Sequence, residues 1–483
     1  MWLQQRVRSG QPMLRYDPVV FNPGAGVQDP TGWSLVPMNA VALGDAGRLQ
    51  PDGTFFLDAG FYYVLGALSG TARTVQSIVA PVGQLPLAVD VVDPRSAASL
   101  ASVSGEALFI GFGLEVPDSG PGGSLVGVYQ AWHPTGLSST VSSGMPEVYA
   151  SLLFLKRESC LAPALQFAAV QAFPSFVGPL TVPLLSWSPL FLNKVQTPDR
   201  QPTKEVFIVQ PDSNGFRVPA GSYFVSGAVA SNLNGAAGAL VVKGASTNPL
   251  LERLLLQAFG GSNGNLQFLG IATVPDDGSG GSELQVCGFP RGRNQFGFRA
   301  NTELANVYVG LTFLSIGTGD CDVLPFRDFF SVVQAWPSGQ NAPKLVSSAT
   351  AYAQLPLTTV VPPPALPTRG PFSTPRLLNG AFLVEAGTWY VVGATTGTAG
   401  MQPVGALLAS LPDPEQARFE AENTLLQATN CFSGNMQFAG VVQLPTRTWV
   451  SLFVSYNAGQ NYGYAVDSGL PEVYSQLSFL RVA

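Results

Sequence analysis

The chain carries few residues of the types that perform acid–base, nucleophilic or metal chemistry. His133 is the only histidine in 483 residues, so a Ser-His-Asp triad or a histidine-rich metal site cannot recur with the repeat described below. The cysteines stand far apart without a CxxC pair, which indicates neither a zinc site nor a dense disulfide framework; they are Cys160, Cys287, Cys321 and Cys431. No GxxxxGK[ST] phosphate-binding motif occurs. We therefore expect a protein that is not an enzyme and has no cofactor.

One acidic motif has residues that could hold a cation. The string Val-Pro-Asp-x-Gly-x-Gly-Gly-Ser occurs at residues 116–124 and 274–282, and it contains Asp118, Asp276 and Asp277. Carboxylates and turn carbonyls suit calcium. Too few ligands of this kind converge, and a polar hairpin tip accounts for the same residues. The sequence favours the hairpin tip and predicts no metal site.

A repeat determines where the other notable residues lie. Three strings recur in the same order three times, about 160 residues apart, which indicates duplicated domains because solenoid repeats span only about 20 to 50 residues. They are Ala-Gly-x-aromatic-aromatic-Val-x-Gly-Ala at 59–67, 220–228 and 386–394, Gly-x-x-x-Phe-x-Gly followed by an apolar residue and proline at 105–117, 264–275 and 434–445, and Val-Tyr-x-x-Leu-x-Phe-Leu at 148–155, 307–314 and 473–480. The second string of the first copy has one extra residue, as a β-bulge requires.

Each string predicts a strand. Adjacent aromatics on a strand face opposite sides of the sheet, so we expect one of each pair to enter the core and the other to contact a neighbour. Stacking on sugars is the alternative, and packing is the preferred interpretation. The core or interface candidates are Tyr62, Tyr63, Tyr223, Phe224, Trp389, Tyr390, Tyr149, Tyr308 and Tyr474.

Two glutamates precede the third string. Glu147 and Glu472 each follow a proline at equivalent places. We expect them to be strand-edge charges, because a charge on an edge strand discourages mispairing.

Charged residues are sparse. Lys and Arg number 24 and Asp and Glu 30, together 11% of the chain against about 25% in an average soluble protein. The net charge of −6 and the absence of a Lys/Arg run argue against a nucleic-acid partner. No charge stands between Ser159 and Asn193, but five prolines there break any helix that could span a membrane. The first ten residues are charged where a signal peptide needs an apolar core, so Sec-type export is not expected.

The length of the chain and the repeat together predict three domains that follow an N-terminal arm. We expect an N-terminal arm over residues 1–30 that docks on a neighbour. The domains are expected over 31–160, 161–325 and 326–483, the second with an uncharged, proline-rich lead-in and the third with a proline-rich one.

An early strand pair and a closing strand carry a resemblance to a known family. In the second copy these residues are Gly215, Phe216, Val218, Gly221, Tyr223 and Phe224, then Tyr308, Gly310, Leu311, Phe313 and Leu314; in the third copy they are Thr448, Trp449, Val450, Leu452, 457–463 and 474–480. The closing strand has its glycine only at Gly310, with Ser151 and Gln476 at the equivalent positions. Each copy resembles the jelly roll shared by tumour necrosis factor ligands and the globular heads of complement. The resemblance implies trimers that bind partners without catalysis.

The expected fold is all-β, with three tandem jelly-roll β-sandwich domains arranged as an intramolecular pseudo-trimer. Units packed together hide apolar flanks that a lone sandwich with so few charges would leave exposed. The competing arrangement is a stacked homotrimeric fibre, in which three chains form rings at three levels.

These features predict a structural protein of a virion, made in the host cytoplasm: a minor capsid, vertex, fibre or spike component. Its expected partners are other capsid or spike proteins, with a host receptor or a glycan as a further partner. The alternative is a complement-like recognition module that binds a protein or glycan at a cell surface. An enzyme of unknown type is a third hypothesis, and it needs an active site in only one of three copies.

Overall fold

The structure is a computed structural model and describes residues 2–3, 33–36, 38, 48–69, 75–83, 97–99, 106–120, 122–132, 150–156, 166–173, 180–192, 194–196, 215–230, 236–245, 248, 251–258, 265–292, 295–296, 306–315, 328–336, 338, 340, 352–361, 374–396, 405–415, 418–428, 435–455 and 466–481. These residues form strands β1 to β32 and a short 3-10 helix, η2 (Ala421–Asn423). Within those ranges, no helix is long and apolar enough to cross a membrane. The predicted all-β class is confirmed.

The strands fall into three consecutive groups, and we call β1–β9 unit 1, β10–β21 unit 2 and β22–β32 unit 3. Each unit contains two main antiparallel sheets. In unit 1 the first sheet runs β1 (Trp2–Leu3), β9 (Ala150–Lys156), β4 (Gly60–Ser69), β7 (Glu106–Val116), and the second runs β2 (Trp33–Val36), β8 (Gly123–Trp132), β5 (Val75–Pro81), β6 (Ala97–Ala98), with β3 (Phe55–Asp58) also paired to β8.

Unit 2 repeats this order. Its first sheet runs β13 (Lys194–Gln196), β10 (Gln166–Phe173), β21 (Asn306–Ser315), β15 (Gly221–Val229), β18 (Leu266–Val274), and its second runs β12 (Ser188–Leu190), β19 (Gly281–Pro290), β16 (Ala236–Val242), β17 (Leu254–Ala258), with β14 (Phe216–Pro219) paired to β19. A separate short pair joins β11 (Leu180–Thr181) to β20 (Gln295–Phe296).

Unit 3 repeats the order again. Its first sheet runs β24 (Thr359–Val361), β22 (Asp328–Trp336), β32 (Glu472–Arg481), β27 (Gly387–Thr396), β30 (Asn435–Leu444), and its second runs β25 (Leu377–Leu378), β26 (Ala381–Val384), β31 (Thr448–Ser455), β28 (Gly405–Leu411), β29 (Thr424–Gln427), with β23 (Ala353–Leu355) paired to β31.

The three recurring strings form equivalent strands. In every unit the strand of the first string (β4, β15, β27) lies between the strand of the third (β9, β21, β32) and that of the second (β7, β18, β30). The extra residue of the first copy is a bulge, as predicted: Val64 pairs with Phe112 and Leu65 with Ile110, so Gly111 is left over at φ 96°. The matching pairs β15–β18 and β27–β30 run without a register shift.

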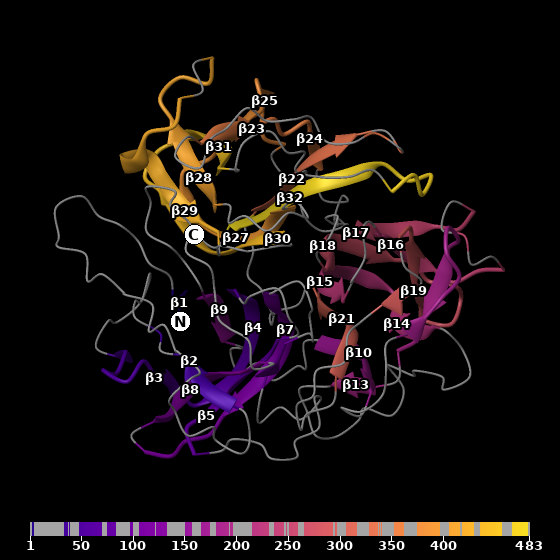
Figure 1. The fold of residues 1–483 in the computed structure, drawn as a ribbon, viewed down its shortest axis with the longest axis horizontal. Coiled ribbons are helices and arrows are strands. Elements are labelled where there is room, and N and C mark those ends of the chain that lie inside the picture. The colour runs from indigo at the N-terminus through magenta and orange to yellow at the C-terminus, as the bar shows by residue number, and fades with distance from the viewer. Residues whose placement is uncertain are drawn as a thin grey trace.

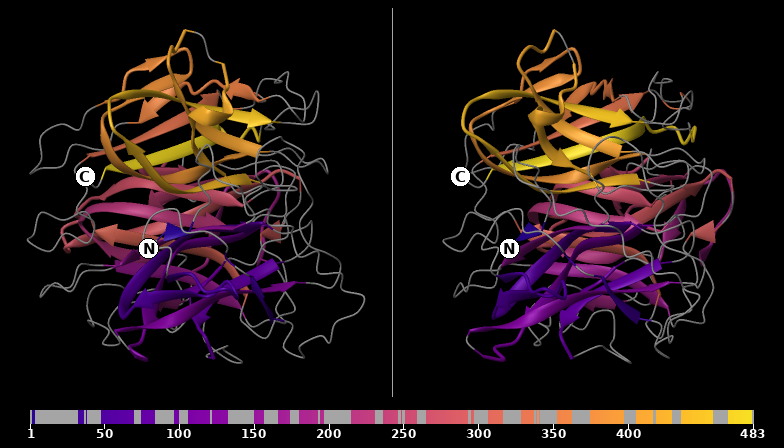
Figure 2. Two further views of the ribbon diagram at one scale, coloured as in Figure 1. Left: turned by 90° about the vertical axis from the view of Figure 1, so that its left-hand side faces the viewer. Right: turned by 60° about the vertical axis from the view of Figure 1, so that its left-hand side comes forward.

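Each unit buries one apolar cluster between its two sheets. These clusters are centred on Phe55, Phe109 and Phe154 in unit 1, on Phe216, Phe268 and Phe313 in unit 2, and on Phe330, Phe438 and Phe479 in unit 3. Figure 1 shows the units around a common centre, with β4, β7, β15, β18, β27 and β30 nearest to it. Seen from the side, the strands of unit 3 lie above those of the other two units (Figure 2).

Several predictions concern residues outside the described ranges. Of the arm over 1–30, only Trp2 and Leu3 are described, and they pair with Leu153 and Leu152 of β9 in the same chain. His133, Glu147 and Tyr149 lie outside the described ranges, as do Cys160, Cys321 and Cys431. The domain boundaries fall in the intervals between β9 and β10 and between β21 and β22, and they stay predictions.

Candidate functional site: the seams between the units

The aromatic pairs of the first string split between two environments. Tyr62, Tyr223 and Trp389 are buried in the cluster of their own unit. Each donates a hydrogen bond to the carbonyl oxygen four residues earlier, at 2.9 Å from Tyr62 to Asp58, 3.0 Å from Tyr223 to Pro219 and 2.9 Å from Trp389 to Glu385. The three copies therefore anchor the same turn with an equivalent hydrogen bond. Desolvation raises the pKa of the Tyr62 and Tyr223 hydroxyls to about 12.

The second aromatic of each pair faces the other units. Tyr63 and Phe224 belong to a buried cluster that takes residues from all three units, and Tyr390 packs against it. We call this set the shared cluster: Tyr63, Leu65, Leu153, Leu155, Phe224, Leu269, Ile271, Leu314, Ala439 and Leu480. Opposite faces of one strand thus serve two cores, as the alternation of a strand requires.

The contacts between units follow one rule. The second-string strand of each unit packs against the third-string strand of another unit: β7 against β21, β18 against β32, and β30 against β9. Strand β7 also touches β15, and β30 touches β4. The contacts are therefore head to tail: the second-string strand of unit 1 meets the third-string strand of unit 2, that of unit 2 meets unit 3, and that of unit 3 meets unit 1. Heterologous contacts of this kind form a ring when they close.

Equivalent hydrogen bonds cross two of these three seams. Ser151 Oγ donates to the carbonyl oxygen of Ala439 at 2.7 Å, and Gln476 Nε2 donates to that of Leu269. Ala439 and Leu269 occupy the same place in the second string, directly after its phenylalanine. The two residues that replace the closing-strand glycine are therefore the donors across the seam.

The third seam has glycine at one of the two corresponding places, since the residue after the phenylalanine of the second string in unit 1 is Ile110. Gly310 stands where Ser151 and Gln476 stand in the other units, and it offers no side-chain donor. Across this seam, a Cβ added at Gly111 would lie 3.3 Å from Cγ2 of Thr312. The β7 backbone therefore approaches unit 2 closely at this seam.

One buried polar contact joins unit 3 to unit 2. Asn435 Nδ2 donates to the carbonyl oxygen of Asn265 at 2.7 Å, and both side chains are fully buried. Among the described residues, no group lies within hydrogen-bond distance of the side-chain amide of Asn265 or of Asn435 Oδ1. Buried amide groups without a partner are costly, so these atoms lower the stability of the contact between units 2 and 3.

A segment of unit 3 covers the outer face of the second sheet of unit 2. Val466 and Leu470 pack on Trp187, Cys287 and Phe289. Trp187 Nε1 donates to the carbonyl oxygen of Ser468 at 3.1 Å. Burial raises the pKa of the Cys287 thiol to about 12, which keeps it protonated. We call residues 466–471 the clasp.

Glu472 holds the clasp in shape. Its carboxylate accepts hydrogen bonds from the backbone N–H of Val466 at 3.0 Å and of Asp467 at 2.9 Å, and the residue is only 5% exposed. The prediction of a strand-edge charge is wrong for Glu472, because β32 lies between β22 and β27 rather than at an edge.

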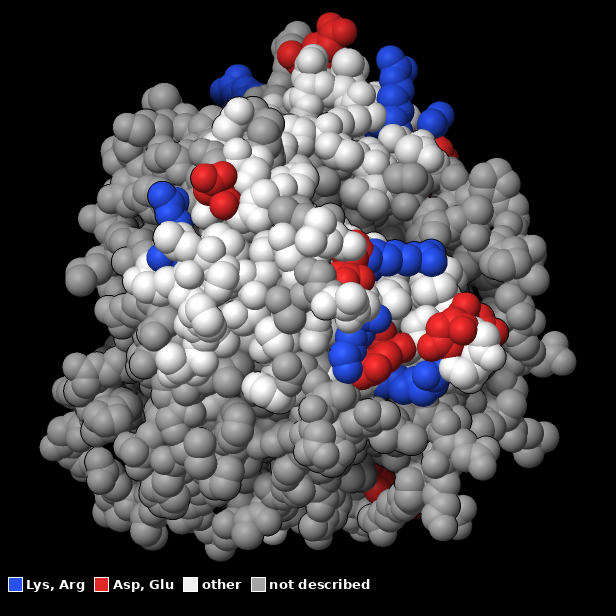
Figure 3. Space-filling model, turned by 90° about the vertical axis from the view of Figure 1, so that its right-hand side faces the viewer, with Lys and Arg blue, Asp and Glu red and all other residues white. Residues whose placement is uncertain are grey.

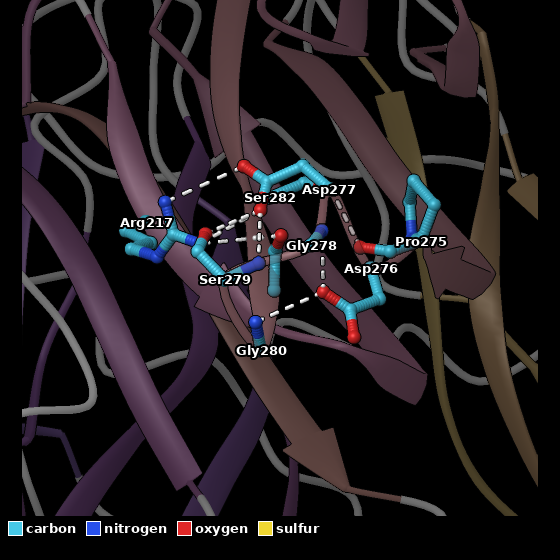
Figure 4. A network of polar contacts seen from close by, with 9 residues as sticks. Arg217, Pro275, Asp276, Asp277, Gly278, Ser279, Gly280 and Ser282 are labelled. Atoms are coloured by element: carbon cyan, nitrogen blue, oxygen red, sulfur yellow. Dashed lines mark hydrogen bonds and ion pairs between the residues drawn. The ribbon is translucent and has the colours of Figure 1, made fainter.

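Asp118 and Asp276 of the glycine-rich loops accept hydrogen bonds from backbone N–H groups of the same loops. Asp276 Oδ1 accepts from the N–H groups of Gly278 and Gly280, both at 2.9 Å (Figure 4). Asp118 Oδ1 accepts in the same way from Gly120 and Gly122. This arrangement is a polar turn, and the described residues contain no group of three His, Cys, Asp or Glu side chains that could hold a metal.

Asp277 serves the neighbouring strand. It pairs with Arg217 of β14 at 3.0 Å (Figure 4). Its pKa is lowered, first by the hydrogen bond from the Ser279 side chain and then by Arg217. The loop is thereby tied to the sheet.

The tyrosines of the third string lie in the unit cores. Tyr308 and Tyr474 are buried there, and each is the extra residue of a bulge: β10 pairs with Val309 and Val307, and β22 with Ser475 and Val473. Sequence reasoning missed Asn265, Asn435 and the clasp. Polar residues inside otherwise apolar strings were the available signal.

No protein-family model matches the chain, and no curated protein sequence matches it. The function must therefore be inferred from the seams and surfaces of the chain itself.

Proposed function

We propose that the chain is a non-enzymatic structural protein of a virion, a minor capsid, vertex, fibre or spike component, built as an intramolecular pseudo-trimer of three jelly-roll units. The observation that carries the proposal is the shared cluster, to which all three units contribute. The head-to-tail contacts and the matched bonds from Ser151 and Gln476 support the same arrangement.

The step from this arrangement to a virion rests on the repeated jelly-roll unit and on the use of its aromatic residues for packing. Jelly rolls are frequent in capsids. The aromatic residues of the repeat pack within and between the units of the chain, and a body assembled in this way suits contacts with other capsid or spike proteins. A receptor or a glycan of the host is a further partner in this proposal.

Two measurements test the proposal. Mass spectrometry of particles purified from the producing host should find the chain in the particle, and its absence from them would refute the virion role. Native mass spectrometry of the free protein should give a single chain of 50.7 kDa. A stable three-chain species would refute the pseudo-trimer, and a glycan array positive for a chain missing from particles would support the recognition module.

A further inference from the structure

Neutral polar side chains are buried where unit 2 meets unit 3. Asn265 stands directly before β18 and Gln267 lies within it, both on the face that carries Leu269 into the shared cluster, because alternate residues of a strand share a face. Asn435 begins β30, and its Nδ2 reaches the carbonyl oxygen of Asn265 across the seam at 2.7 Å. Asn265 and Asn435 are fully buried, and Gln267 is 6% exposed. We call Asn265, Gln267 and Asn435 the amide set.

Four buried atoms of the amide set need hydrogen-bond partners. Within the described part of the chain, no partner lies near Oδ1 or Nδ2 of Asn265, Oδ1 of Asn435 or Nε2 of Gln267. Two of these atoms are acceptors and two are donors. Turning the Asn265 amide over exchanges its oxygen and nitrogen, so either orientation leaves one of each. Buried polar groups nearly always bond to protein or to ordered water, and such a partner would remove their cost to the contact between the units.

The chemistry around the amide set calls for a neutral ligand. An ion in a buried site needs a countercharge. Among the buried residues of the described ranges only Glu472 is charged, and its carboxylate accepts hydrogen bonds from the clasp. On the side of the molecule seen in Figure 3, charged side chains stand on the outer surface in small groups of both signs. A ligand that both donates and accepts hydrogen bonds suits two acceptors and two donors, whereas a cation suits only the acceptors and an anion only the donors.

We propose that the amide set binds ordered water, one or two molecules held between unit 2 and unit 3. Water donates two hydrogen bonds and accepts two, and a buried molecule typically makes about three. One molecule can bridge the Asn265 amide to Asn435 Oδ1, and Gln267 Nε2 can donate to the same molecule or to its neighbour. Bonds through water are nearly as favourable as direct ones, so the bridge strengthens the contact that Asn435 Nδ2 already makes.

The pattern of amides assigns this site to units 2 and 3. Unit 1 has Glu106 and Leu108 at the positions that Asn265 and Gln267 occupy before the phenylalanine of the second string. Leu108 is buried and its side chain forms no hydrogen bond. Units 2 and 3 are therefore the one pair in which both second-string strands carry amides, and bound water distinguishes their contact from the other two.

A crystal structure of the full chain, at a resolution that shows ordered water, tests the site directly. The wild type should have a solvent peak about 2.7 to 3.2 Å from the Asn265 amide and from Asn435 Oδ1. Asn265→Leu keeps the branching of asparagine and the main-chain carbonyl that Asn435 bonds, but it has no polar side-chain atom, so the peak should be lost. Thr395→Val is the matched control. It removes a buried hydroxyl that bonds Ser475 within unit 3 at 2.7 Å, and it should keep the peak.

Urea unfolding gives a second readout that needs no crystals. If water satisfies the amide set, Asn265→Leu breaks its bonds and should lower the midpoint of unfolding. If the amides have no partner, the same substitution removes an unpaired buried group and should raise the midpoint. Asn265→Val has a smaller side chain and should also lower the midpoint, which separates lost hydrogen bonds from excess bulk.

Other results would overturn the proposal. A wild-type structure in which these amides bond to protein groups, or to nothing, leaves no water site. A peak with oxygen ligands at about 2.3 to 2.6 Å would be a cation such as calcium instead. A peak that persists in Asn265→Leu, or one that is lost in Thr395→Val, would show that the amide set does not hold it. A higher midpoint in Asn265→Leu, or a loss that disappears in Asn265→Val, would contradict bonds to water.

Discussion

At the residue scale, the buried hydroxyls of Tyr62 and Tyr223 make the stability of the molecule depend on alkaline pH. Burial raises both pKa values from 10 to about 12. The neutral form is therefore favoured in the folded state, and its contribution is complete below the unfolded pKa near 10 and is lost as the pH rises toward 12.

We predict that the free energy of unfolding falls between pH 10 and about pH 12, and that this fall is smaller in Y62F/Y223F. Each substitution also removes a hydrogen bond to a carbonyl oxygen and should cost about 1 kcal/mol at neutral pH. Urea unfolding at a series of pH values measures both effects. An unchanged slope in the double variant would show that other groups control the alkaline limit.

The seam donors give a second prediction at this scale. Ser151→Ala and Gln476→Gly each leave a buried carbonyl oxygen of the neighbouring unit without its donor, so each should lower the free energy of unfolding by about 1 to 3 kcal/mol. Ser331→Ala is the control, because Ser331 bonds Ser478 within unit 3.

Hydrogen exchange separates a loss at the seam from a general loss. Gln476→Gly should raise exchange in β18 of unit 2, across the seam, whereas Ser331→Ala should affect unit 3 first. Equal exchange in β18 for both variants would contradict a specific role for Gln476.

At the element scale, the glycine near the end of the first string permits two strands to lie close together. A Cβ on Gly393 would stand 2.1 Å from the carbonyl oxygen of Gln476, and one on Gly66 would stand 2.0 Å from that of Ser151. Strand β32 or β9 would have to move, and these are the strands that form the seams.

We predict that Gly393→Ala lowers the free energy of unfolding by about 3 kcal/mol or more, because the clash adds to an unfavourable φ of 158°. Gly83→Ala is the matched control. Its φ is 81° and nothing lies within 4 Å of the added Cβ, so it should cost only about 1 to 2 kcal/mol of backbone strain. Guanidinium unfolding compares the two. Similar losses would mean that strain, and not the approach of β32, explains the glycine.

The strands also show which features could be predicted from the sequence and which could not. The strings predicted the strands, the two faces of each aromatic pair and a bulge in the first copy, because these depend on local spacing. The prediction for Glu472 was wrong because its environment is tertiary. Strand β22, which pairs with β32, lies far away in the sequence, and the clasp takes its shape only when it packs on unit 2. Ser151 and Gln476 have partners in another unit, which no local pattern specifies.

At the scale of the whole molecule, each unit has its own core but shares one face with the others. An isolated unit 2 would keep the cluster between its sheets and would expose Phe224, Leu269, Ile271 and Leu314. An exposed apolar patch of this kind promotes association. The separate cores also agree with the expected domain boundaries at residues 160 and 325, which stay predictions.

We predict that residues 161–325 alone give a β-type circular dichroism spectrum but self-associate and bind a hydrophobic dye. The head-to-tail rule requires β18 of one copy to meet β21 of the next, with Gly310 opposite the carbonyl oxygen that Gln476 satisfies in the full chain. The substitution G310Q supplies that donor and should tighten the association, whereas I271E should prevent it by placing a charge in the shared cluster.

Light scattering coupled to size exclusion measures the size of the assembly. Three copies of the isolated unit, with G310Q shifting the equilibrium further toward three, are expected if the seams alone determine the arrangement. A monomer that binds no dye would mean that the face toward the other units does not promote self-association. Association that G310Q leaves unchanged would mean that the polar bond does not select the arrangement, and that the apolar contacts of Phe224 and Ile271 are sufficient to form it.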